Sequence, residues 1–186
     1  MAEIVSIANQ KGGVGKTTTA INFSASLAVA EKRVLLIDID PQGNSTSGLG
    51  FDKDQQFITT YDILINQTRP ADVIQKSEVK RLDLIPSNIN LIGAELELIE
   101  VKEREFVLKK ALDGIKGNYD YIVIDCPPSL GLLTINALRG SLRIWLNAII
   151  APTIGSAPKV GPPIASMPFP FINFKRLERI VSRDIF

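Results

Sequence analysis

The feature that most constrains how this chain can fold is a glycine- and lysine-rich turn between a strand pattern and a helix pattern. Residues 3–8 (EIVSIA) are short, apolar and β-branched, and apolar residues recur at helical spacing over residues 16–30. The turn between them contains KGGVGKT at residues 11–17. Its glycines let consecutive backbone N–H groups point at phosphate oxygens, and the N-terminus of the following helix adds partial positive charge. The sequence therefore predicts a phosphate-binding loop, or P-loop.

The two lysines of this loop have different expected roles. Lys16, at the junction of loop and helix, should reach the β- and γ-phosphates of ATP, and the Thr17 hydroxyl should ligate Mg²⁺. The usual motif has glycine at position 10, where this chain has Gln10, and the additional Lys11 marks the deviant, two-lysine subclass. An incidental glycine-rich turn is the alternative interpretation. The predicted nucleotide contacts are Lys11, Gly12, Gly13, Val14, Gly15, Lys16, Thr17 and Thr18.

Further apolar runs predict an α/β fold with a parallel sheet flanked by helices. Residues 33–39 (RVLLIDI) and 119–125 (YDYIVID) are nearly continuous apolar runs, as in strands that are buried on both faces, and residues 82–86 indicate a short strand. The order strand, helix, strand predicts a βαβ unit with a right-handed crossover. We expect the C-terminal part of this P-loop fold to be incomplete.

The segments between these strands predict one loop and several helices. Residues 41–50 (PQGNSTSGLG) concentrate turn residues and should form a loop at the carboxyl end of a strand, where open α/β sheets bind ligands. We expect a short helix at 61–66, one or two polar-faced helices over 94–115 and a helix over 130–138.

Three aspartates fall at the predicted carboxyl ends of strands. Asp125 ends an apolar strand, which is the arrangement that delivers a carboxylate to the water shell of Mg²⁺. Asp38 and Asp40 alternate at strand spacing, so they face the same way only if the strand has ended by Asp40. We expect Asp38 near Mg²⁺ and Asp40 in the loop, where it would orient the attacking water. Turn capping is the alternative role for Asp40 and Asp125. The predicted metal-binding residues are Thr17, Asp38 and Asp125, and the predicted catalytic residues are Lys11, Lys16 and Asp40.

The scarcity of two residue types excludes several kinds of chemistry. The chain has no histidine, so a Ser-His or Cys-His mechanism has no imidazole base. The single cysteine, Cys126, can form neither an internal disulfide nor a zinc or iron–sulfur site within one chain, and we expect it to be a small buried residue. No apolar run reaches the ~18 residues of a membrane span, and residues 1–3 show no signal-peptide layout. A cytoplasmic location is the expectation.

The composition changes after Leu138. Residues 1–138 contain 14 Lys or Arg and 18 Asp or Glu, whereas residues 139–186 contain 7 and 2. Of the 11 prolines, 6 fall in the last 48 residues, where they oppose long helices and central strands. We therefore expect an ATPase domain at 1–138 and a basic, Pro-rich tail at 139–186 that is poorly packed or partly extended up to about residue 173. The basic tail has two possible interpretations. Its positive charge attracts nucleic acid or an anionic membrane surface, or its charged side chains are simply solvated and have no partner.

Three segments in this order resemble the ParA/Soj partition ATPases of bacterial chromosomes and plasmids. They are KGGVGKTTTAINFSASLA at 11–28, RVLLIDIDPQGNSTSGLG at 33–50 and YIVIDCPPSLGLLTINAL at 121–138. The resemblance implies an ATP-dependent sandwich dimer in which Lys11 reaches the partner's nucleotide. It also implies non-specific DNA binding, which would place the dimer on the nucleoid, and a ParB-like partner that stimulates hydrolysis. Chromosome or plasmid segregation is the implied role.

The resemblance covers roughly residues 2–138 and then stops. The family would continue with further βα units that carry adenine contacts and DNA-binding basic residues, and the sequence from Arg139 on does not match them. Residues 148–152 (AIIAP) are a candidate for the next strand. We expect a truncated or frame-disrupted product that binds nucleotide weakly and supports little DNA binding.

Four other interpretations compete with this one. A nitrogenase-iron-protein-like carrier needs cluster cysteines, and a related tyrosine kinase needs a tyrosine-rich tail, whereas all three tyrosines precede residue 122. A MinD-like membrane-positioning ATPase would end in a basic amphipathic helix, and apolar residues over 174–185 do fall on one helical face. The loop at 40–44 (DPQGN) favours the partition branch. A MinD-like ATPase and a non-catalytic remnant remain the alternatives.

Overall fold

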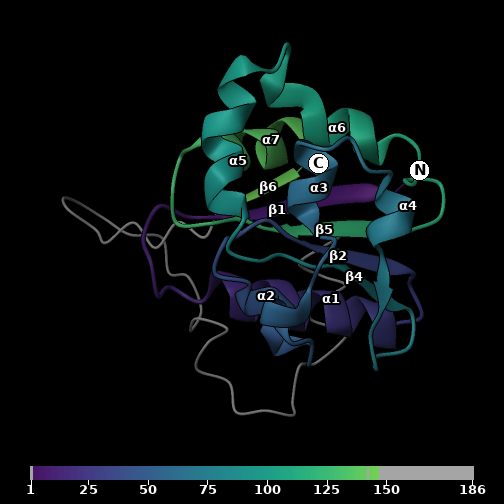
Figure 1. Ribbon diagram of the computed structural model, residues 1–186. Coiled ribbons are helices and arrows are strands. Elements are labelled where there is room, and N and C mark those ends of the chain that lie inside the picture. Colours follow the sequence, from purple (N-terminus) through teal and green to yellow (C-terminus); the bar gives the residue numbers. More distant parts are fainter. Residues whose placement is uncertain (1, 142, 147–186) are drawn as a thin grey trace. The chain divides into compact units, whose positions relative to one another are not determined.

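The apolar runs of the chain form one sheet that is covered by helices on both faces (Figure 1). The computed structural model describes residues 2–141 and 143–146. All of the described residues belong to one unit of the chain, Met1–Ala148. The strands are β1 Glu3–Ala8, β2 Val34–Asp38, β3 Gln75–Lys76, β4 Leu82–Ile85, β5 Tyr121–Asp125 and β6 Arg143–Leu146. The α-helices are α1 Lys16–Val29, α2 Asn44–Gly48, α3 Thr60–Leu64, α4 Pro70–Val73, α5 Leu91–Glu97, α6 Val107–Leu112 and α7 Leu132–Gly140.

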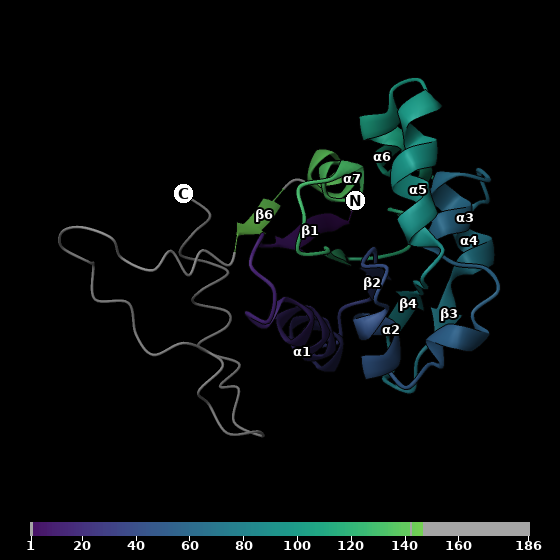
Figure 2. The same ribbon diagram turned by 60° about the vertical axis from the view of Figure 1, so that its left-hand side comes forward.

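The six strands lie in the order β3-β4-β2-β5-β1-β6. Pairing is parallel from β4 to β6, and only the two-residue β3 pairs antiparallel with β4. Figures 1 and 2 show α1 and α2 on one face of the sheet and α3, α5, α6 and α7 on the other. With both faces covered, every residue of β2 and β4 is buried, which is why these strands are nearly continuous apolar runs in the sequence. The α/β class with a parallel sheet is confirmed, with the antiparallel edge strand as the one departure.

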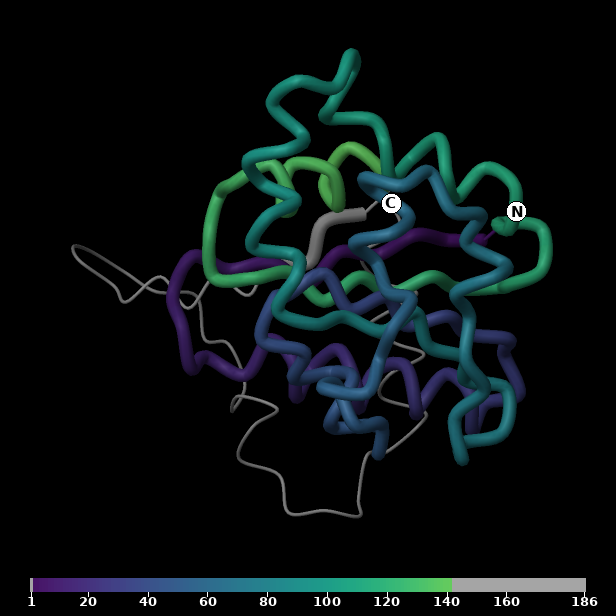
Figure 3. Tube along the Cα trace, viewed as in Figure 1, coloured from purple at the N-terminus to yellow at the C-terminus, as the bar shows by residue number. Residues whose placement is uncertain are grey.

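The carboxyl ends of the parallel strands lie at one edge of the sheet. Figure 3 shows that the segment after β1 and the segment after β5 both lie at this edge. Ile7 of β1 and Asp38 of β2 are both register partners of Asp125 in β5. The fold therefore brings together three loops that are far apart in the sequence.

Two predicted segments differ from the structure. The expected loop at 41–50 contains a helix, α2, because the Asp38 carboxylate accepts the backbone N–H of Thr46, which satisfies a donor in that helix. A Cβ at Gly48 would collide with Ile21 of α1, so α2 packs closely on α1. The hydrogen bond from Thr46 to Asp38 and the packing of Gly48 on Ile21 are tertiary contacts, so turn propensity alone could not predict this helix.

The helical region expected over 94–115 is interrupted between α5 and α6. Two 3₁₀ turns, Leu98–Glu100 and Arg104–Phe106, lie in between, and Glu103 has a positive φ of 53°. The buried side chain of Asn136 in α7 fixes this break, because its amide donates to the Arg104 carbonyl at 2.7 Å and its oxygen accepts the Leu108 N–H at 3.1 Å. Asn136 thus substitutes for the hydrogen bonds that a continuous helix would supply.

Regular structure continues past residue 138. Helix α7 extends to Gly140, and β6 pairs in parallel with β1 at Arg143–Leu146. Regular structure thus reaches into the first residues of the segment that we expected to be poorly packed or partly extended from about Arg139, ahead of the prolines, which begin only at 152. The candidate strand at 148–152, the rest of the tail and the amphipathic pattern at 174–185 lie outside the described residues. The domain boundary at Leu138 stays a prediction.

Candidate active site

The P-loop connects β1 to α1 in an open conformation. Gly13 and Gly15 have φ angles of 70° and 86°, which residues with a side chain rarely adopt. A Cβ added at Gly12, Gly13 or Gly15 would have no other atom within 4 Å. The space beside these three glycines is therefore open. No side chain caps α1 at Gly15, so the first N–H groups of this 14-residue helix remain available to an anion.

The two lysines of the loop lie in different surroundings. Lys16 is only 6% exposed, and its ammonium donates to the Lys11 carbonyl at 3.4 Å. This contact folds the Lys16 side chain back over the loop. The side chain of Lys11 is exposed, and its backbone N–H donates to Oδ1 of Asn9 at 2.9 Å. One lysine of the loop is therefore buried and the other is exposed.

Asp125 is fully buried at the end of β5 and has one unused oxygen. Its Oδ2 accepts the Ser45 hydroxyl at 2.8 Å, whereas Oδ1 has no hydrogen-bond partner among the described residues. Burial raises the pKa of this carboxyl to about 6, against the lowering effect of the nearby Ser45 and Thr17 side chains and the Lys16 ammonium. A buried oxygen without a partner is rare in folded proteins and calls for an explanation, such as a bound ion or water.

Asp38 lies beside Asp125 and is also fully buried, but both of its oxygens are used. Oδ1 accepts the Asp40 N–H at 3.1 Å, and Oδ2 accepts the N–H and the hydroxyl of Thr46, each at 2.8 Å. Burial, and secondly the charge of Asp125, raise the pKa of Asp38 to about 7. The Asp38 carboxylate thus holds both ends of the segment 40–46.

Asp40 begins the loop after β2, because the strand ends at Asp38 as the proposed geometry required. Asp40 is 6% exposed, and its Oδ1 accepts the Gln42 N–H at 2.9 Å. Its negative charge also contributes to the raised pKa of Asp125. One Asp40 oxygen therefore stabilises the turn, as the capping interpretation expected, and the residue also lies at the shared edge of the sheet.

Three hydroxyl residues of this site were not predicted from the sequence. Ser45 and Thr46 open α2 and bond Asp125 and Asp38, and Ser87, which follows β4, bonds the Asp40 carbonyl at 2.5 Å. Their contacts join segments that are 8 to 80 residues apart. The available signal was the position of Ser87 directly after an apolar strand, at the same edge of the sheet.

The donors at this edge suit a magnesium ion that is shared with a phosphate. Among the described residues, no group of three or more His, Cys, Asp or Glu could hold a metal ion without other ligands. Nucleotide-bound Mg²⁺ does not need such a group, since it keeps several waters and takes few protein oxygens. The free oxygen of Asp125, near the Thr17 hydroxyl, fits this type of coordination. The single cysteine, Cys126, is buried as expected.

Comparisons with known proteins place this geometry in a family. A family model described as an AAA domain (AAA_31) matches residues 2–151. The chain is 58% identical over 141 residues to the sporulation initiation inhibitor protein Soj of Bacillus subtilis, covering 76% of this chain and 56% of that protein. It is 53% identical over 141 residues to the chromosome partitioning protein ParA of Myxococcus xanthus, covering 76% and 50%.

Solved structures agree with these sequence relatives. The cobyrinic acid a,c-diamide synthase of Mycobacterium smegmatis with a bound ATP analogue and magnesium superposes with a TM-score of 0.76 at 40% identity, over 78% of this chain and 59% of that one. The chain spans about half the length of the curated relatives it matches. No helix within the described residues is both long and apolar enough to cross a bilayer.

Proposed function

Because the chain belongs to the AAA_31 family of AAA domains and is of the ParA/Soj type, we propose that it binds ATP with Mg²⁺ and hydrolyses the ATP as a partition ATPase. The observation that carries this proposal is the buried, unpartnered Oδ1 of Asp125 at the same edge of the sheet as the buried Lys16 and an open P-loop. A carboxylate oxygen, a lysine and free backbone N–H groups are the groups that a magnesium-bound triphosphate needs.

Nucleotide binding is assigned to the P-loop and the first turn of α1. Backbone N–H groups from Gly12 to Thr18 would surround the phosphates, and the partial positive charge at the start of α1 would favour them. Lys16 would leave the Lys11 carbonyl, to which its 3.4 Å contact is long, and meet the β- and γ-phosphates. The open space around the glycines supports this assignment, because bulky side chains there would fill the phosphate site.

The magnesium site is assigned to Thr17, Asp125 and Asp38 in unequal roles. The Thr17 hydroxyl would be a direct ligand, and the free Oδ1 of Asp125 would accept from the ion's water shell. Asp38 already accepts three protein hydrogen bonds, so its role would be to add negative charge and to hold the neighbouring loop. Bound Mg²⁺ supplies charge neutralisation of the phosphate oxygens.

Hydrolysis is assigned to Asp40 as the residue that orients the attacking water. Phosphoryl transfer passes through a loose transition state, so positioning and electrostatics matter more than a strong base. One oxygen of Asp40 is fixed by the Gln42 N–H, which leaves the other to accept from a water. Lys16 would stabilise charge on the transferred phosphoryl group.

The assembly and the biological role are proposed from the relatives. In this proposal two chains form an ATP-dependent dimer, and the exposed Lys11 of each chain contacts the nucleotide of the other. A ParB-like protein would stimulate hydrolysis. Non-specific DNA binding would place the dimer on the nucleoid within the cytoplasm, and we expect this binding to be weak, because the sequence from Arg139 on does not match the DNA-binding units of the family. Segregation of a chromosome or plasmid is the proposed outcome, since a matched relative is a chromosome partitioning protein.

Equilibrium binding of labelled ATP, with Mg²⁺ and with EDTA, tests the core of this proposal on the purified 186-residue chain. We expect saturable binding that is tighter with Mg²⁺, together with measurable phosphate release. A melting curve in the same buffers shows whether the nucleotide stabilises the fold. A folded chain that shows no ATP binding at any Mg²⁺ concentration contradicts the assignment.

A further inference from the structure

We propose that Ser87 is a positioning residue for hydrolysis, which holds the loop that carries Asp40. This inference rests on the proposed ATPase function. Ser87 follows β4, the strand beside β2, and is fully buried at the same edge of the sheet. It contacts neither the P-loop nor Asp125 through any described hydrogen bond, so its effect on the reaction passes through Asp40.

Ser87 bonds the loop after β2 near both of its ends. Its hydroxyl donates to the Asp40 carbonyl at 2.5 Å, which is short for a hydroxyl donor. Its backbone N–H donates to the Thr46 hydroxyl at 3.0 Å, and that hydroxyl donates in turn to Asp38. The loop also packs directly on this residue, since a Cβ added at Gly43 would lie 3.1 Å from the Ser87 carbonyl.

The position of the Asp40 side chain depends on these hydrogen bonds from Ser87. Its carboxylate is bonded to Gln42, which belongs to the same loop and moves with it. The position of the loop relative to the sheet must therefore come from other segments. The Asp38 carboxylate supplies part of it through the Asp40 N–H, and Ser87 supplies the hydrogen bond to the carbonyl on the other side of the same residue.

Loss of this hydrogen bond should affect turnover and not nucleotide affinity. The P-loop lies between β1 and α1 and would bind the phosphates unchanged. A displaced Asp40 would orient the attacking water less well, and misplacement of reacting groups by about 1 Å can lower a rate by up to ~10²-fold. For Ser87→Ala we expect kcat to fall on the order of tenfold, with the Kd for ATP within about twofold of wild type.

Ser24 provides a matched control, because it is also a fully buried serine and its hydroxyl has no hydrogen-bond partner among the described residues. Ser24→Ala should leave kcat, the Kd for ATP and the loop unchanged. Hydrogen exchange in the nucleotide-free chain gives a second measurement. In Ser87→Ala the Gly43 and Thr46 amides, which bond Asp40 and Asp38, should exchange faster than in wild type and in Ser24→Ala.

The outcomes separate this inference from the proposed function. A wild-type chain that neither binds nor hydrolyses ATP overturns the function, and the exchange rates then still decide whether Ser87 holds the loop. If the wild-type chain is active and Ser87→Ala matches Ser24→Ala in both kcat and exchange, the inference fails and the function stands. An equal loss of affinity and kcat also overturns the inference. If Ser87→Ala melts below the assay temperature, Ser87→Cys, which has a weaker donor, takes its place. Its kcat should fall below that of wild type and its Gly43 and Thr46 amides should exchange faster, and unchanged kcat and exchange overturn the inference.

Discussion

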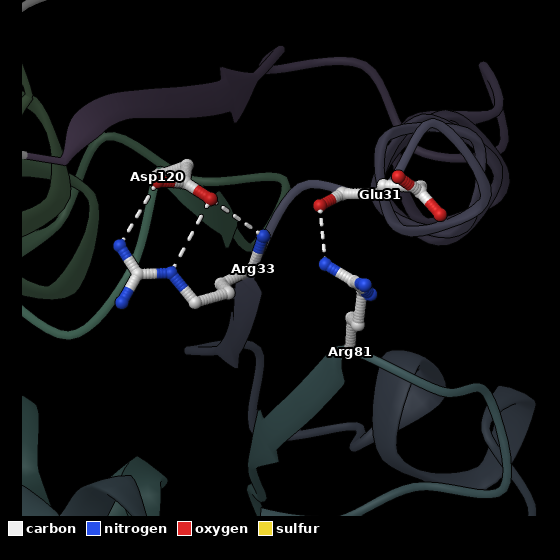
Figure 4. A network of polar contacts seen from close by, with 4 residues as sticks. All are labelled: Glu31, Arg33, Arg81 and Asp120. Atoms are coloured by element: carbon white, nitrogen blue, oxygen red, sulfur yellow. Dashed lines mark hydrogen bonds and ion pairs between the residues drawn. The ribbon is translucent and has the colours of Figure 1, made fainter.

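The two edges of the sheet both gather charged residues, but they use them differently. At the carboxyl edge, Asp38 and Asp125 are fully buried and have raised pKa values, and one Asp125 oxygen has no partner. At the amino edge, the Arg33 guanidinium meets Asp120 through two donors, at 3.0 and 3.4 Å, and Arg81 donates to the Glu31 carbonyl at 2.8 Å (Figure 4). The first edge holds unsatisfied, buried charge, whereas the second holds exposed charge with partners.

A cavity of about 440 Å³ lies at the amino edge, and the basic residues that line it suggest a binding site. Three of its four cations already have a structural role, since Arg33 pairs with Asp120, Lys76 pairs with Asp83 and Arg81 caps the chain after α1. The residues that line it are Arg33, Lys76, Ser77, Val79, Lys80, Arg81, Leu82, Asp83, Asn118 and Tyr119. The unpartnered oxygen of the buried Asp125 carboxylate, next to an open P-loop, therefore marks the carboxyl edge as the candidate site, whereas cavity size and charge count do not mark the amino edge as one.

The largest expected effect separates two lysines, one at each edge. Lys16→Ala should abolish measurable ATP binding, because the phosphate charge then has no buried ammonium to meet it. Lys80→Ala, which removes an exposed lysine at the amino edge, should leave the Kd unchanged. Isothermal titration of ATP with Mg²⁺ into both variants measures this. If the Lys16 variant binds ATP with wild-type affinity, the carboxyl edge is not the nucleotide site.

Lys11 tests whether the carboxyl edge is completed by a second chain. Lys11→Ala should still bind ATP, because Lys16 remains, but it should fail to form the ATP-dependent dimer. Sedimentation velocity with and without ATP gives the readout, with Lys80→Ala again as the lysine control. An ATP-dependent dimer as stable as that of wild type would confine the role of Lys11 to its own loop.

Asp40 and Asp120 are aspartates at opposite edges of the sheet, so replacing each one tests which edge is needed for ATP hydrolysis. Asp40→Ala should keep ATP binding and lose turnover by on the order of 10²-fold, the scale of one transition-state-positioning group. Asp120→Ala should change turnover little, since its partner Arg33 directly precedes β2, at the opposite end of that strand from the loop that carries Asp40. Phosphate-release assays at saturating ATP compare them. Wild-type turnover in the Asp40 variant would return that residue to turn capping alone.

The sequence predicted the components of the site that lie within short segments. The P-loop, Lys16 and the strand-ending Asp125 follow from the order strand, loop, helix and from apolar runs, which are local patterns. Ser45 and Ser87 were missed because their roles consist of hydrogen bonds across 80 and 47 residues of sequence. Helix α2 was missed for the same reason, since the Asp38 carboxylate satisfies a donor within it. Periodicity and turn propensity contain no information on such contacts.

Thr46 tests whether the buried hydroxyls at the carboxyl edge also stabilise the fold. Thr46→Val keeps the shape of the side chain but leaves the Ser87 N–H without its acceptor and removes one donor to Asp38. An unsatisfied buried donor costs about 1–3 kcal/mol, so the free energy of unfolding in urea should fall by that amount. Thr18→Val, on the exposed side of α1, is the control for a similar change. Equal stability of the two variants would show that this network contributes little.

The smallest expected effect is at the amino edge, where the Arg33 pair is solvent-exposed. Hydrogen bonds from Arg33 hold the pKa of Asp120 at about 2, below the ~3.9 of an unfolded aspartate. A depressed pKa adds stability that is complete above about pH 4 and is lost as the pH falls toward 2. Asp120→Asn should therefore melt slightly below wild type at pH 7, and the difference should shrink in acid and in high salt, because exposed pairs are screened. Melting temperatures from pH 2 to 7 at two salt concentrations measure it, and a difference that persists unchanged at pH 2 would mean that packing, and not charge, explains the pair.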